Sequence, residues 1–107
     1  MKENCVIELK GKSQIVTAAI HDGHQLSAEH LRLSGLSEIE RLREEDPFTG
    51  VWAKMSDNHI VARKSRFEYD LNRPPEKAIY ILPSDAWGLN VWKTDPPEEI
   101  TQNALKA

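Results

Sequence analysis

The run over residues 66–75, RFEYDLNRPP, constrains the fold of this chain more than any other segment. Its alternating apolar residues predict a strand, and the two prolines forbid helix continuation and fix the backbone where the strand ends. Asn72 and Arg73 are therefore expected at a rigid exit turn. There the arginine offers a planar donor fork that fits a carboxylate, and the asparagine adds a neutral donor and acceptor. A purely structural role is the alternative, in which Arg73 pairs with Asp70 or Glu76 and the asparagine marks a turn.

A second informative feature is the run over residues 15–24, IVTAAIHDGH. An apolar, partly β-branched segment stops at His21, and Gly23 permits a sharp turn before His24. Two imidazoles at the mouth of a buried strand, with a carboxylate between them, predict half of a zinc site. Loops at the carboxyl ends of parallel strands are also where open α/β sheets bind ligands. The His-x-x-His spacing alone fixes no geometry, so two ordinary loop histidines are the alternative.

These features, in this order, resemble the N-formylglutamate amidohydrolase family. The resemblance rests on the strand that ends in His-Asp-Gly-His, on the loop REEDPFT at residues 43–49, and on SRFEYDLNRPP at residues 65–75. It covers residues 14–95. The family is similar in fold and site to zinc carboxypeptidases and aspartoacylase-type deacylases. The resemblance therefore implies an α/β fold, a partial phosphorylase/hydrolase-like (zinc-carboxypeptidase-like) sheet flanked by helices.

The resemblance implies a Zn²⁺ site on the histidine loop. His21 would be the first ligand, and His24 stands where the related deacylases have an acidic second ligand, with Asp22 or Glu45 as substitutes. Three acids end the helix predicted before Pro47, against its dipole, and a solvated charged turn is one explanation. By the resemblance, Glu45 and Asp46 lie near the site. They are candidates for metal binding, for catalysis, or for holding His21 in its tautomer, and we favour the last role.

The resemblance also implies a substrate and a reaction. Asn72 and Arg73 match the pair that binds the substrate carboxylate in the carboxypeptidase-like enzymes, and Arg66 would add positive charge. The implied activity is zinc-dependent hydrolysis of an N-acyl amino acid. The relatives are longer and have a third ligand and a general-base glutamate downstream, whereas this chain has no histidine after His59. We therefore expect residues 1–107 to be one domain, the amino-terminal portion of such an enzyme and inactive alone. The alternative is a non-catalytic scaffold that binds a small carboxylate.

Composition limits the remaining function classes. The net charge of −3 argues against a general nucleic-acid binder. Cys5 is the only cysteine, so no internal disulfide can form, which favours the cytoplasm. The sequence has no apolar run of membrane-spanning length and no signal-peptide pattern. A truncated sheet would expose an edge strand, which favours a homo-oligomer.

The local patterns predict an α/β order of elements. The predicted strands span residues 5–9, 14–20, 58–63 and 78–82, and the first two are expected to pair as a hairpin. Ser27 and Ser37 are predicted to cap two helices. In the second helix, Ile39 and Leu42 are expected to face inward and Arg41 and Glu45 to face solvent. A last helix is predicted over residues 99–107 with Asp95 as its N-cap, and its lack of a stop signal suggests a longer protein.

Overall fold

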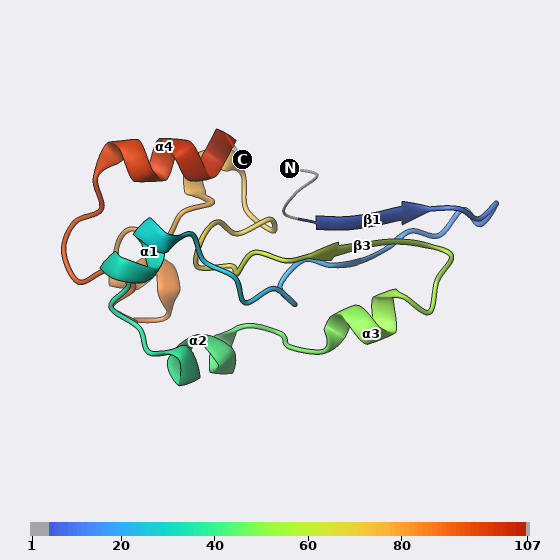
Figure 1. The fold of residues 1–107 in the computed structure, drawn as a ribbon, viewed down its shortest axis with the longest axis horizontal. Helices are drawn as coiled ribbons and strands as arrows, with labels where there is room; N and C mark the ends of the chain where they lie inside the picture. The colour runs from blue at the N-terminus through green and yellow to red at the C-terminus, as the bar shows by residue number, and fades with distance from the viewer. Residues whose placement is uncertain (1–4, 107) are drawn as a thin grey trace.

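Strand β3 (Asn58–Ala62) is the centre of the sheet in the computed structural model, which describes residues 5–106. On one side it pairs antiparallel with β1 (Cys5–Leu9), with Cys5 opposite Ala62. On the other side it pairs parallel with β2 (Thr17–Ala19), with Thr17 opposite His59. The three-stranded sheet therefore has the order β1-β3-β2. Figure 1 shows β1 and β3 side by side at the end of the molecule away from α1 and α2.

The strands confirm two of the predictions and correct several others. The strand predicted from the alternation of Phe67, Tyr69 and Leu71 is wrong, because residues 66–68 form a turn in which the Glu68 N–H donates to the Ser65 carbonyl over 2.9 Å. The strands predicted at residues 5–9 and 58–63 are present. The predicted hairpin is wrong, because β1 and β2 both pair with β3 and not with each other. The second strand is also shorter than predicted, and Ile15 and Val16 before it are exposed. The Asn58 side chain ties the segment between β1 and β2 to β3. Its amide donates to the Ser13 carbonyl over 3.0 Å, so this segment is held by β3 and does not form the second strand of a hairpin.

The helices begin largely where the capping signals place them. Ser27 caps α1 (Ala28–Leu33) and Ser37 caps α2 (Glu38–Glu44), in the second case with a complete capping box. Helix α3 (Thr49–Ala53), which begins at the last residue of the predicted loop 43–49, packs against β2 and β3. Helix α4 (Glu98–Lys106) begins after Pro97, so Asp95 is not its N-cap. The predicted strand at residues 78–82 is wrong, because irregular chain lies there between the 3₁₀ helices η2 (Pro75–Lys77) and η3 (Pro83–Ala86).

Helix α2 has the opposite orientation to the one that its apolar residues indicate. Arg41 and Glu45 are 5% and 4% exposed, whereas Ile39 is 65% exposed. The inward face therefore carries an ion pair, Arg41 Nη1 to Glu45 Oε2 at 3.4 Å. Because α2 has only two turns, its apolar periodicity is weak, and the polar contacts of Arg41 and Glu45 decide which face of the helix is buried.

The core lies mainly at the end of the molecule where the helices gather. One cluster packs Tyr80 among apolar side chains, namely Leu36, Phe67, Ala86 and Val91. A second cluster joins α4 to the segment after β3 through Tyr69, Ala78, Ile79 and Ala104. The molecule is elongated, with extents of 47 × 26 × 23 Å. Among residues 5–106, no helix has the length and apolar character needed to cross a bilayer.

Candidate functional site

The loop after β2 and the segment after β3 lie against each other at one edge of the sheet. A Cβ on Gly23 would lie 2.3 Å from the Lys64 carbonyl oxygen, so only glycine allows this close approach. The two segments then bond directly, because Ser65 N donates to the Gln25 carbonyl over 2.8 Å. Both segments follow the carboxyl ends of parallel strands, which brings His21 to the neighbourhood of residues 65–70.

His21 lies between two carboxylates of very different exposure. Its Nε2 is 2.6 Å from Oδ1 of Asp70, whose side chain is 1% exposed. Its Nδ1 is 3.5 Å from Oδ2 of Asp46, whose side chain is 55% exposed. The Asp46 backbone N–H also donates to the His21 carbonyl over 2.9 Å. A neutral ring that donates its Nε2 proton to the buried carboxylate presents the Nδ1 lone pair toward Asp46.

Asp70 is the centre of a buried polar network. Besides the imidazole, its carboxylate accepts hydrogen bonds from the Tyr80 hydroxyl and, over 2.8 Å, from the Asn72 backbone N–H. It also forms ion pairs with Arg66 Nη2 at 3.3 Å and Arg73 Nε at 3.5 Å. Burial raises the pKa of Asp70, but the hydrogen bonds from Tyr80, the imidazole and the backbone outweigh it, so the pKa falls below its ordinary value. Asp70 is therefore a buried anion.

The predicted carboxylate-binding pair is on one turn, but its two members are placed differently. The Arg73 side chain is 30% exposed and its Cζ lies 4.4 Å above the centroid of the Tyr80 ring. It lines a cavity of about 250 Å³ with apolar walls that include Leu71 and Leu105. Asn72 is exposed and joins the network through its backbone. Arg73 forms the ion pair with Asp70 that the structural alternative predicts. Its side chain also has the exposure that ligand binding requires.

Arg66 is held by protein groups through all three of its guanidinium nitrogens. Nε donates to the Tyr80 hydroxyl over 3.0 Å, Nη1 to the Glu44 carbonyl over 2.9 Å, and Nη2 pairs with Asp70. Its Cζ also lies 4.8 Å from the centroid of the Trp87 ring. Burial lowers the pKa of Arg66, but the bonds to Tyr80 and Asp70 dominate and raise it. These contacts place Arg66 beneath the site, where it stabilises the Asp70 anion.

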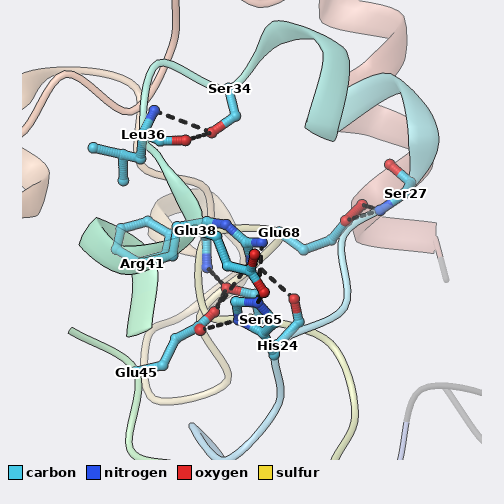
Figure 2. A network of polar contacts seen from close by, with 10 residues as sticks. His24, Ser27, Ser34, Leu36, Glu38, Arg41, Glu45, Ser65 and Glu68 are labelled. Carbon is cyan, nitrogen blue, oxygen red and sulfur yellow. Dashed lines mark hydrogen bonds and ion pairs between the residues drawn. The ribbon is translucent and has the colours of Figure 1, made fainter. Parts of the chain in front are cut away.

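His24 belongs to a second network, which Figure 2 shows from close by. Its Nδ1 is 2.5 Å from Glu45 Oε1, and its Nε2 is 3.1 Å from Glu38 Oε1. Arg41 donates to the His24 carbonyl over 2.8 Å, and the Ser65 hydroxyl donates to Glu45. Glu45 is thus buried and fully engaged between the histidine loop, α2 and the segment after β3, so it holds these three parts together.

The side chains that could hold a metal ion lie around His21 and His24. Residues 5–106 contain no group of three or more His, Cys, Asp or Glu side chains that could hold one. They do contain pairs at a suitable spacing, because two ligands of tetrahedral zinc lie about 3.3 Å apart. His21 Nδ1 and Asp46 Oδ2 are 3.5 Å apart, and His24 Nε2 and Glu38 Oε1 are 3.1 Å apart. Both ring nitrogens of His24 contact a carboxylate, Glu45 at Nδ1 and Glu38 at Nε2. The Asp22 carboxylate lies against Gly50 of α3. The described residues therefore fit two positions of a zinc site.

A third histidine network lies around His30, which no motif of the sequence singles out. His30 is 3% exposed, and its Nδ1 lies 3.0 Å from Glu68 Oε1. Glu68 also accepts from the Ser27 backbone N–H over 2.9 Å, which Figure 2 shows. Burial raises the pKa of Glu68, but the bonds to His30 and Ser27 lower it overall. The contact of Asp70 with His21, and that of Tyr80 with Asp70, could likewise not be predicted, since no local spacing joins Asp70 to His21.

Comparison with known proteins gives one match. No curated protein and no solved structure matches the chain significantly. The family model described as N-formylglutamate amidohydrolase matches residues 13–107, which include the three histidine networks and the turn that carries Arg73. The chain therefore belongs to the N-formylglutamate amidohydrolase family.

Proposed function

We propose that this protein is part of a zinc-dependent amidohydrolase that acts on N-acyl amino acids. His21 and Asp46 would supply two zinc ligands, and a group outside residues 5–106 would supply the third. The observation that carries the proposal is the arrangement Asp70–His21–Asp46, in which a buried anion holds one ring nitrogen and an exposed carboxylate lies beside the other. A carboxylate that fixes the far nitrogen of a histidine is the usual support of a metal ligand.

The residues of this chain would divide the remaining work between them. Asp70 holds the imidazole in one tautomer and orientation. Arg73, partly exposed at the cavity, would bind the carboxylate of the substrate, and Asn72 beside it would add an amide contact. Zinc, when bound, supplies a Lewis acid for amide hydrolysis. The apolar walls of the cavity suit the non-reacting part of an amino acid.

The second network would support this site without taking part in the chemistry. The Glu45 side chain is 1% exposed and bonded to His24, Arg41 and Ser65. A carboxylate so enclosed is poorly placed to meet a substrate. Asp46, which follows it and is exposed, is the better placed of the two acids.

A second candidate function follows from the incomplete set of ligands. A catalytic zinc site needs three protein ligands with an open position, and residues 5–106 place two donors together. The chain could then act as a non-catalytic domain that binds a small carboxylate at Arg73.

Zinc-dependent release of a free amino acid from N-formylglutamate and N-acetyl amino acids tests the proposal. Because the proposal takes the third ligand from outside residues 5–106, the assay uses the protein as it is naturally produced, incubated with Zn²⁺, with His21→Ala as the inactive comparison. Product that needs both zinc and His21 supports the enzyme. A folded protein that binds N-acetyl amino acids without hydrolysing them contradicts the enzyme and supports the binding domain.

A further inference from the structure

Tyr80 contacts both halves of the proposed site from inside the core. It is 0% exposed, and its ring packs edge-on against Phe67 at a centroid distance of 5.7 Å. Its hydroxyl donates to Asp70 and accepts from Arg66 Nε over 3.0 Å. The face of the same ring lies 4.4 Å from the Arg73 Cζ. One side chain therefore touches the anion behind the histidine and the cation at the cavity.

The two contacts of Tyr80 use different parts of the side chain. The hydroxyl binds Oδ2 of Asp70, whereas His21 binds Oδ1 of the same carboxylate, so the phenol fixes the carboxylate plane that the imidazole meets. The ring attracts the Arg73 guanidinium through its π face, an interaction that gains strength when it is desolvated. Removing the hydroxyl would affect the first contact and spare the second.

We propose that Tyr80 is a positioning residue that sets His21 through its hydroxyl and Arg73 through its ring. The assignment rests on the proposed function, because it gives Tyr80 a role in holding a metal ligand and a substrate-binding cation together. The pKa of Tyr80 is raised to about 12, by burial first and by the bond to Asp70 second. The phenol consequently stays a neutral donor, as the bond to an ionised carboxylate requires.

NMR spectroscopy of the metal-free protein separates the two contacts. The imidazole ¹⁵N shifts of His21 report its tautomer and partner, and are assigned with His21→Gln. The side-chain Nε–H and Hδ signals of Arg73 report ring-current shielding, and are assigned with Arg73→Lys. Tyr80→Phe keeps the volume of the ring and should move the His21 nitrogen shifts while the shielding of Arg73 persists. In zinc-loaded protein it should weaken zinc binding about tenfold, as loss of a residue behind a ligand does.

Two further variants complete the test. Tyr80→Leu removes both parts and should move the His21 shifts and abolish the shielding of Arg73. Thr101→Val deletes an exposed hydroxyl, whose bond to the Glu98 carbonyl is 2.8 Å long, and should change neither signal. If Tyr80→Leu does not fold, shielding of Arg73 in the wild type and in Tyr80→Phe still tests the ring contact. Unchanged His21 shifts in Tyr80→Phe, or an unshielded Arg73 in the wild type, would overturn the assignment. Because these signals need no metal, a protein that fails to bind zinc would refute the proposed function and leave this test intact.

Discussion

Replacing the buried Asp70 carboxylate by an amide is the most informative perturbation of this fold. In the wild type, Oδ1 accepts from His21 and from a backbone N–H, and Oδ2 accepts from Tyr80 and pairs with Arg66 and Arg73. The amide in Asp70→Asn can take two orientations, and in each of them its NH₂ group faces hydrogen-bond donors from which it cannot accept. The variant also removes the negative charge beside two guanidinium groups.

The expected cost follows from the burial of these partners. Breaking one side of a buried ion pair costs about 3–5 kcal/mol. Arg66 is 12% exposed and receives this penalty nearly in full, whereas Arg73 is 30% exposed and is partly resolvated. We expect Asp70→Asn to lower the free energy of unfolding by about 3–5 kcal/mol, a large share of the roughly 5–15 kcal/mol of an ordinary domain. Urea denaturation followed by tryptophan fluorescence measures the change from the shift in midpoint.

Asp46→Asn is the matched control, because Asp46 is the other acid beside His21. Its side chain is 55% exposed and lies 3.5 Å from the ring. Removing an exposed charge should cost at most about 1 kcal/mol. An equal cost for the two variants, or a cost below about 1 kcal/mol for Asp70→Asn, would show that the network does not hold a buried anion.

Three further substitutions test other parts of the account. Arg73→Ala should weaken binding of N-acetylglutamate by about 1.5–3 kcal/mol in calorimetric titration. Lys10→Ala should not, because it removes an exposed cation that lines neither of the two cavities beside Arg73. Ser37→Ala should lower the free energy of unfolding by about 1 kcal/mol in thermal denaturation, because it removes the capping box of α2. The pKa of Glu68 is lowered from 4.5, so its ionised form adds stability that is present above the unfolded pKa and lost as the pH falls through the folded pKa. Glu68→Gln should therefore flatten the dependence of the urea midpoint on pH in this acid range, and an unchanged slope would contradict the assignment.

Features that depend on neighbouring residues could be predicted from the sequence. The strand at residues 5–9 and the caps at Ser27 and Ser37 are present, since turn and capping preferences act over three or four residues. The family could also be recognised from the sequence, because its motifs are short and local. Their order along the chain was enough to identify it.

Features that depend on distant partners could not be predicted. The pairing of β2 with β3 joins segments that are remote in the sequence, and nothing local in residues 14–20 indicates it. The inward face of α2 is set by contacts of Arg41 and Glu45 with His24, which no helical periodicity contains. The site shows the same limit. His21 was predicted as a site residue, but its contact with Asp70 follows only from the way in which two strand ends meet.

Zinc affinity in a set of three variants tests the central claim most directly. Competition with a chromophoric chelator gives the dissociation constant for the wild type, His21→Ala, Asp46→Asn and His24→Ala. If His21 and Asp46 are the ligands, their variants should bind zinc at least about tenfold more weakly, and His24→Ala should stay near the wild type. Loss of binding in His24→Ala with full retention in Asp46→Asn would contradict the account and would favour the pair of histidines as the metal site.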